Sequence, residues 1–301
     1  MTKPNDSRAA SKPGESRKEG VAGAGELALV ATPIGNLGDL SPRAADWLKS
    51  ADAIACEDSR VTVKLLHHLG IKKPLLSYHD HNADEMRPKL IERLQRGERI
   101  ALVSDAGTPL ISDPGFKLVR AAAELGLAVT ALPGPSAPIM ALILSGRPTD
   151  RFLFLGFLAA KSAGRRSELE EVAQVRASLI LFETAPRLET ALEDLLAVLG
   201  NRPAAVAREL TKMFEEVRRG TLADLLAHYR EAGPPKGEIV IVIGPPLADS
   251  GIGAADLDAA LRKALGSMRV KEAAEAVAAA TGLPKRQVYQ RALELKQDGD
   301  A

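Results

Sequence analysis

The stretch "RIALVSDAGTPLISDPG" at residues 99–115 joins a strand signal to an unusual loop. Its first six residues form an apolar run typical of a buried strand, whereas residues 105–115 contain two Asp, two Gly and two Pro. A simple strand-to-helix turn needs one glycine or one capping residue, so this composition indicates a loop shaped around a ligand. The alternative is that Asp105 and Asp113 only cap the turn and the start of a helix.

Similar apolar runs recur along the chain and alternate with segments of helical period. Ser41 followed by Pro42, for example, predicts a helix start with an N-cap and a proline in the first turn. This alternation predicts an α/β fold, with two α/β domains built on mostly parallel sheets. The 213–220 run alternates in charge, so it is predicted to be an antiparallel or edge strand. The predicted strands are 26–31, 52–56, 74–78, 99–104, 127–132, 152–157, 178–183, 203–207, 213–220 and 238–244.

Breaks in composition divide the chain into four parts. Glycine, proline and polar residues near 145–151 predict a domain boundary. A polar start without an apolar segment indicates a disordered tail. The prediction is therefore a disordered tail at 1–24, an N-terminal α/β domain at 25–146, a C-terminal α/β domain at 147–246, and a small helical, helix-turn-helix-like extension at 253–301.

Composition limits the class of protein. The 301 residues are 46% hydrophobic, which suffices for two cores, and the net charge of +1 gives no strong overall field. Cys56 is the single cysteine, which argues against a disulfide framework and indicates a reducing, cytoplasmic compartment. No apolar run is long enough for a membrane span, so we expect no membrane partner.

Glycine, proline, Asp and Ser concentrate in the loops that follow the predicted strands. In parallel sheets these loops meet at one edge, where ligands bind. The segment "GVAGAG" (20–25) precedes the first strand rather than following it, and no phosphate-binding loop signature occurs, which argues against a pyrophosphate ligand. His79 and His81 with Asp84 resemble part of a metal site but lack a third anchoring ligand, so no metal is expected.

Five segments in a fixed order resemble the tetrapyrrole-methylase superfamily, and more narrowly its bacterial ribosomal RNA small subunit methyltransferase I branch. The resemblance spans about residues 26–245 and continues more loosely beyond them. The first loop contains "PIGN" rather than the Gly-Asp-Gly type of small-molecule members, which favours the RNA branch. The segments are "VATPIGNLGDLSPRA" (30–44), "ACEDSRVT" (55–62), "SDAGTPLISDPG" (104–115), "LPGPSAP" (132–138) and "FETAPRL" (182–188).

The resemblance implies that S-adenosyl-L-methionine binds in a cleft between two α/β domains. It also implies a homodimer that methylates the ribose 2′-oxygen of a cytidine in the decoding centre of 16S rRNA, within the small ribosomal subunit. Phe182, Met213 and Gly237 would then flank the adenine. The other implied cofactor contacts are Pro33, Asp105, Gly107, Thr108, Leu110, Ile111, Ser136 and Ala137.

Charged residues at two strand ends are candidates for the chemistry. A ribose hydroxyl is a weak acid, so a base, or a cation that favours the alkoxide, would assist its attack. The alternative for each group is a structural ion pair, and the sequence does not identify the base. The candidates are Glu57, Asp58 and Arg60 after one strand and Arg208, Glu209 and Lys212 after another.

The last forty residues form a basic helical segment. Residues 262–296 contain eight Lys or Arg and three Glu. The pattern predicts two short helices with a tight turn, and Lys285, Arg286 and Arg291 on the second helix would suit RNA phosphates. The alternative is an amphipathic hairpin that only packs on the catalytic body.

Two other functions remain open at this level. One is a small-molecule tetrapyrrole methylase of the precorrin or uroporphyrinogen type, against which the basic tail argues. The other is a non-catalytic ribosome-assembly factor that keeps a cofactor pocket as a structural element. Neither DNA nor a membrane is expected as a partner.

Overall fold

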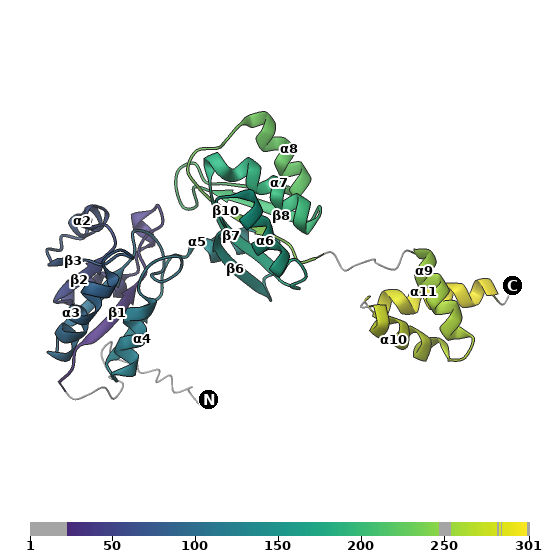
Figure 1. The fold of residues 1–301 in the computed structure, drawn as a ribbon, viewed down its shortest axis with the longest axis horizontal. Helices are drawn as coiled ribbons and strands as arrows, with labels where there is room; N and C mark the ends of the chain where they lie inside the picture. The colour runs from purple at the N-terminus through teal and green to yellow at the C-terminus, as the bar shows by residue number, and fades with distance from the viewer. Residues whose placement is uncertain (1–22, 247–253, 282, 284, 300–301) are drawn as a thin grey trace, which may run out of the picture. The chain divides into compact units, whose positions relative to one another are not determined.

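The structure is a computed structural model that describes residues 23–246, 254–281, 283 and 285–299 (Figure 1). Most of the predicted tail at 1–24 therefore lies outside the described residues. The chain divides into two compact units: the first runs to Met140 and includes Leu210–Met213, and the second comprises the rest. The first unit thus ends six residues before the boundary expected from the sequence.

The first unit is built on a wholly parallel five-stranded sheet in the order β3-β2-β4-β1-β5. Leu27 pairs in register with Ile100 on one side and Val129 on the other, so β1 is a central strand. The strands are β1 (Glu26–Val30), β2 (Ala53–Cys56), β3 (Leu75–Ser77), β4 (Arg99–Val103) and β5 (Ala128–Leu132).

Helices cover both faces of this sheet. Trp47 and Leu48 of α1 (Pro42–Ser50), with Leu66 of α2 (Ser59–His68), belong to one core cluster. Helices α3 (Ala83–Gln95) and α4 (Phe116–Glu124) contribute to a separate cluster on the other face. The predicted start of α1 is confirmed, because the Ser41 hydroxyl accepts a hydrogen bond from the Ala44 amide at 3.1 Å.

The second unit contains a mixed five-stranded sheet in the order β6-β7-β10-β8-β9. Only β6 and β7 pair in parallel, and the other three pairings are antiparallel. The expectation for the 213–220 run is confirmed, since β9 is an antiparallel edge strand joined to β8 by a short loop that holds no helix. The strands are β6 (Phe152–Phe157), β7 (Ser178–Thr184), β8 (Pro203–Arg208), β9 (Glu216–Thr221) and β10 (Glu238–Ile243).

The α/β class with two sheets is confirmed, but the two sheets differ in strand direction. The first matches the parallel arrangement predicted from alternating strands and helices, whereas the second departs from it. The reason is the β8–β9 connection: without a crossover helix it reverses the chain. Strand β10 then enters between β7 and β8 and runs antiparallel to both.

One hydrophobic core joins the helices of the second unit to its sheet. It includes Leu169 from α6 (Ser162–Val172), Leu192 from α7 (Leu188–Leu199) and Leu225 from α8 (Leu222–Ala232). Two further short helices of the chain are η1 (Leu37–Asp39) and η2 (Ala185–Arg187), and α5 (Ala137–Ser145) follows β5.

Three helices near the C-terminus share a core of their own. They are α9 (Ala254–Leu265), α10 (Val270–Thr281) and α11 (Lys285–Gly299), and Leu261 and Val288 are fully buried between them. Arg291 forms ion pairs with Asp258 of α9 at 2.7 Å and with Glu294 at 2.7 Å. Among the helices described, none is both long and apolar enough to cross a membrane.

Candidate functional site

The carboxyl edge of the first sheet contains a topological switch point between β1 and β4. The connections that follow β1 and β2 carry α1 and α2 over one face, whereas those around β4 carry α3 and α4 over the other. Loops that leave two adjacent strands in opposite directions open a crevice, which is where open α/β sheets bind ligands. We call the loops at this edge, residues 31–36, 57–58, 104–115 and 133–136, the first-sheet rim.

Hydrogen bonds tie the rim loops to one another. Thr32 and Gly107 exchange two backbone hydrogen bonds, at 2.9 Å and 3.1 Å, which join the loops after β1 and β4. The Thr108 hydroxyl donates to the Pro135 carbonyl at 3.0 Å, which adds the loop after β5. The structure therefore brings together three of the loops that the sequence predicted to meet.

Several residues of the 104–115 loop have positive φ values, a strained backbone conformation that the surrounding contacts must hold in place. Gly107 has φ +83°, and a Cβ there would lie 3.3 Å from an Ile34 methyl group. Leu110 and Ser112 also have positive φ, at 73° and 65°, although neither is glycine. Such strain costs about 1–3 kcal/mol per residue and concentrates at ligand sites.

Carboxylates crowd the rim. The Asp105 Oδ1 accepts a hydrogen bond from the Asp58 amide at 3.0 Å, which fixes this side chain next to the end of β2. Burial raises the pKa of Glu57, and Asp105 and Asp80 raise it further. Burial also raises the pKa of Asp113 to about 6, with Glu57 as the second cause. Carboxyl groups whose pKa values move toward neutrality can hold and release a proton, or oppose a cation.

Asp58 and Arg60, unlike Glu57, interact mainly with each other at the start of α2. Asp58 is the N-cap of α2, since its Oδ1 accepts from the Arg60 amide at 2.8 Å. The Arg60 guanidinium pairs with the same carboxylate at 2.6 Å, and these hydrogen bonds lower the pKa of Asp58 to about 2. This carboxylate is occupied by the helix cap and the ion pair, which matches the structural alternative rather than the role of a base.

The second unit positions Arg208, Glu209 and Phe182 at ends of its strands. Arg208 Nε donates to Glu216 Oε2 at 2.8 Å, across the β8–β9 hairpin. Glu209 Oε1 accepts from the Glu238 amide at 3.1 Å, beside Gly237. The Phe182 ring lies 5.1 Å and 5.3 Å, between centroids, from Phe154 and Phe157. Arg208 and Glu209 are thus held by contacts inside their own sheet.

Lys212 and Met213 belong to the segment that groups with the first unit. A Cβ at Gly35 would lie 2.3 Å from Lys212 Cγ, so only glycine lets this side chain cross the loop after β1. Met213 is 90% exposed, which leaves a large apolar side chain uncovered within this chain. The sequence offered no signal that Lys212 approaches the first loop.

Two carboxylates at or near the first-sheet rim were not predicted as functional. Asp113 appeared only as a possible cap, yet its raised pKa places it among the rim carboxylates. Asp80 follows β3 and raises the pKa of Glu57. The signal that could have identified both is their position in the loops after β3 and β4, the two strands that flank β2 in the sheet.

The described residues contain no cluster of three His, Cys, Asp or Glu side chains suited to a metal ion. Asp84, near His79 and His81 in sequence, instead forms an ion pair with Arg87 at 2.9 Å on the surface of α3.

Comparison with known proteins identifies the family. Residues 26–226 match the family described as "Tetrapyrrole (Corrin/Porphyrin) Methylases", and residues 252–296 match the "RsmI C-terminal HTH domain". A protein of Mesorhizobium japonicum named "Ribosomal RNA small subunit methyltransferase I" is 50% identical over 271 residues, covering 90% of this chain and 92% of its own. The chain belongs to the ribosomal RNA small subunit methyltransferase I family.

Other members of the family are similarly close. Proteins of the same name from Erythrobacter litoralis and Escherichia coli O157:H7 are 53% and 44% identical. Each alignment covers 90% of this chain and 95% of the relative.

Solved structures support the fold. A diphthine synthase aligns with a TM-score of 0.57 at 17% identity, covering 73% of this chain and 90% of that one. A uroporphyrin-III-C-methyltransferase of Thermus thermophilus aligns at 0.51 and 20% identity, covering 75% and 95%.

Proposed function

We propose that this chain is an S-adenosylmethionine-dependent methyltransferase acting on the ribose 2′-oxygen of a cytidine in the decoding centre of 16S rRNA. The observation that carries the proposal is the similarity to proteins named "Ribosomal RNA small subunit methyltransferase I", which extends over about nine-tenths of the chain at 44–53% identity. The specific nucleotide and atom come from the family resemblance in the sequence.

The side chains of the first-sheet rim fit the proposed cofactor. S-Adenosylmethionine carries a sulfonium and an ammonium cation, and its ribose has two hydroxyls that donate hydrogen bonds. The carboxylate of Asp105 would oppose the positive charge and accept hydrogen bonds from the ribose hydroxyls of the cofactor. Ile111, which is 40% exposed, offers an apolar surface to the flat adenine ring. When bound, the cofactor supplies an electrophilic methyl group.

The remaining residues proposed for the cofactor lie in or next to the rim loops after β1, β4 and β5, in the segment Leu210–Met213, or in the second unit. Pro33, Gly107 and Thr108 lie where the first two of these loops are bridged. The others are Leu110, Ser136, Ala137, Phe182, Met213 and Gly237.

We propose that the Glu57 carboxylate acts as the general base and accepts the proton of the attacking ribose hydroxyl. Its pKa is raised by burial and by neighbouring carboxylates, which makes it a stronger proton acceptor than an exposed Glu. Asp58 is less suited because its pKa is lowered. The chain would otherwise act by holding the hydroxyl in line and excluding water, and positioning of this kind supplies a large part of the rate.

The basic helical segment is the second part of the proposal. Lys285 and Arg286 are exposed at the start of α11 and would contact RNA phosphates. Arg291 is less available than the sequence suggested, because it holds α9 and α11 together through Asp258. Removing residues 253–301 would weaken RNA binding and leave cofactor binding unchanged; equal RNA affinity without the segment would contradict this role.

The test is methyl transfer by the full chain from labelled S-adenosylmethionine to three acceptors. These are small ribosomal subunits from a strain lacking the modification, free 16S rRNA from the same strain, and uroporphyrinogen III. We expect label on one cytidine 2′-oxygen of the rRNA, mapped by reverse transcription, and none on the tetrapyrrole. Label on the tetrapyrrole alone, or on no acceptor, would overturn the proposal. Light scattering of the full chain tests the homodimer that the family resemblance implies.

A further inference from the structure

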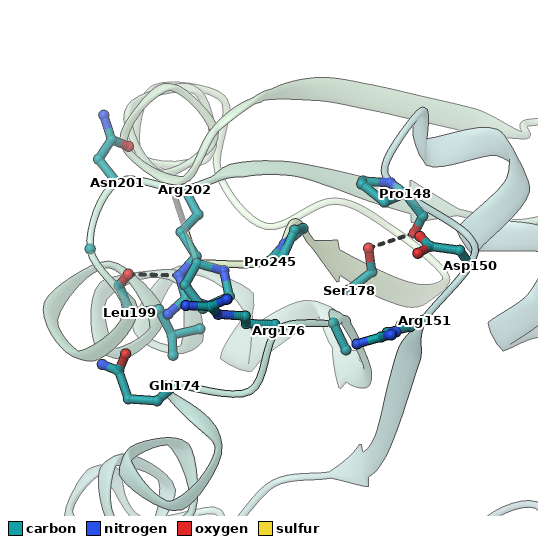
Figure 2. A pocket seen from close by; sticks show the side chains of 13 residues that line it. Pro148, Asp150, Arg151, Gln174, Arg176, Ser178, Leu199, Asn201, Arg202 and Pro245 are labelled. Carbon is teal, nitrogen blue, oxygen red and sulfur yellow. Dashed lines mark hydrogen bonds between the residues drawn. The ribbon is translucent and has the colours of Figure 1, made fainter. Parts of the chain in front are cut away.

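A cavity of about 580 Å³ lies within the second unit, at one end of the strands of its sheet (Figure 2). It is lined where β7 and β8 begin and where β10 ends, by Ser178, Arg202 and Pro245 among others. Phe182 and Arg208 lie toward the other ends of the same strands. The cavity is therefore separate from the residues proposed for methyl transfer.

The lining is positively charged. Arg151, Arg176 and Arg202 line the cavity, and Asp150 is the one carboxylate among the lining residues. Within the described part of the chain, none of the three arginines forms an ion pair. An uncompensated cluster of guanidinium groups around a cavity attracts an anion.

Arg202 gives this cluster its clearest sign of a ligand. The residue is only 4% exposed, its Nε donates to the Leu199 carbonyl at 2.9 Å, and its Nη2 donates to the Ala173 carbonyl. Its buried Nη1 has no hydrogen-bond acceptor among the described residues. Burial without a counter-charge lowers the pKa of Arg202, and a buried unpaired donor is costly. An anion in the cavity would offset this cost.

The volume of the cavity and its other lining side chains favour an organic ligand over a bare inorganic ion. A volume of about 580 Å³ is within the range of cavities that hold small organic ligands. Gln174 contributes a side-chain amide, which can hydrogen-bond a nucleobase edge, whereas the Asn201 Oδ1 accepts a hydrogen bond from the Ala223 amide at 2.9 Å. Leu199, Pro148 and Pro245 contribute apolar surface, and a guanidinium plane can stack on a base.

We infer that this cavity is a nucleotide-binding site, in which the arginine cluster holds a phosphate and the Gln174 amide contacts the base. Guanidinium groups bind phosphate oxygens in paired, charge-assisted hydrogen bonds. The nucleotide is either a unit of an RNA strand or a free mononucleotide, which share this chemistry. The site goes beyond the proposed methyl transfer and does not depend on it.

The experiment measures binding to the full chain by calorimetry, with S-adenosylhomocysteine in excess to occupy the proposed cofactor site. The probes are inorganic phosphate, cytidine 5′-monophosphate and a short single-stranded RNA of mixed sequence. The variant is Arg151→Gln with Arg176→Gln, because both residues are exposed and, within the described part of the chain, neither side chain forms a hydrogen bond or an ion pair. Arg202→Gln is avoided as the primary variant, since Arg202 bonds two carbonyls.

A matched control removes two arginines elsewhere. Arg120→Gln with Arg230→Gln changes the net charge equally, and both side chains are exposed on helices and do not line the cavity. We expect the cavity variant to lose at least about tenfold in affinity for the monophosphate, and the control to change by less than about twofold.

The outcomes separate the possibilities. A loss larger for RNA than for the monophosphate identifies an RNA strand as the ligand, and equal losses identify a free nucleotide. Absence of binding by the unmodified chain, or equal affinity in the cavity variant and the control, would overturn the inference. Methyl transfer to small subunits is measured in parallel, so that failure of that activity with intact nucleotide binding counts against the proposed function alone.

Discussion

The two units use their carboxylates in opposite ways. In the first-sheet rim, Asp113 and Glu57 face other carboxylates, and burial together with this crowding raises the pKa of each. In the second unit, Asp194 lies between Arg165 and Arg166 with its side chain 3% exposed. Burial alone would raise the pKa of Asp194, but hydrogen bonds from Arg166, Ser162 and Arg165 hold it below its ordinary value.

The difference indicates which charges serve stability and which serve chemistry. A buried carboxylate with full hydrogen-bond partners fixes one arrangement of its helices, and here it joins α6 to α7. Crowded carboxylates without matching cations cost stability, and proteins keep such groups mainly at functional sites. Four substitutions test this contrast.

The largest expected effect is the loss of stability on breaking the buried ion pair of the second unit. Asp194→Asn would leave Arg165 buried without a counter-charge, and we expect a loss of about 3–5 kcal/mol in the free energy of unfolding. Urea denaturation measures it. Glu193→Gln on the same helix is the control, because Glu193 pairs with Arg230 at the surface and contributes less than about 1 kcal/mol. Equal effects of the two substitutions would show that the buried pair is not what stabilises this unit.

Glu57→Gln tests the crowded carboxylates of the first-sheet rim through their effect on the rate of methyl transfer. We expect kcat for methyl transfer to fall about a hundredfold, with cofactor affinity changed by less than about threefold. Since Glu57 must be ionised to accept a proton, the activity of the unmodified chain should fall as pH decreases through its raised pKa. A variant that retains full kcat would exclude Glu57 as the proton acceptor.

Asp105→Asn tests the same rim through binding. The amide oxygen can still accept from the Asp58 amide, so the fold should be kept while the charge is lost. We expect S-adenosylmethionine affinity to fall about ten- to a hundredfold, measured by calorimetry, with little change in Tm. Asp46→Asn, on the exposed surface of α1, serves as the control. Unchanged affinity in Asp105→Asn would contradict the assignment of the rim to the cofactor.

The smallest effect is on stability at the rim. Because the pKa of Asp113 is raised from 3.8 to about 6, the folded chain binds this proton more tightly than the unfolded chain does. The stability from this group is complete below about pH 4 and is lost as pH rises through about 6. Asp113→Asn should therefore stabilise the protein at about pH 8, by about 1 kcal/mol after solvent screening, and not at about pH 4. Urea unfolding at the two pH values gives the comparison, and a destabilised variant at the higher pH would contradict it.

Local patterns in the sequence predicted the first unit well. Apolar runs located all five of its strands, and Ser41 with Pro42 located the start of α1. The rim followed from these strands, because parallel strands direct their following loops to one edge. Contacts between distant residues were not predictable in this way, including the Asp105–Asp58 hydrogen bond and the approach of Lys212 to Gly35.

The strand order and strand directions of the second unit could not be predicted from local patterns in the sequence. The insertion of β10 between β7 and β8 depends on pairing among strands far apart in sequence, and apolar runs carry no information on direction. The buried Arg165–Asp194 ion pair was also not predictable, because charged residues on a helix usually indicate a solvent-exposed face. Asp58 was a candidate for catalysis, yet its cap on α2 depends on where that helix begins.

The most direct test of the account is a crystal of the full chain soaked with S-adenosylmethionine. We predict the cofactor against the first-sheet rim, with a carboxylate oxygen of Asp105 within hydrogen-bond distance of it and the Thr32–Gly107 bridge beneath it. Density for the cofactor away from residues 31–36 and 104–115, or none at saturating concentration, would contradict the central claim that these loops form the methyl-donor site.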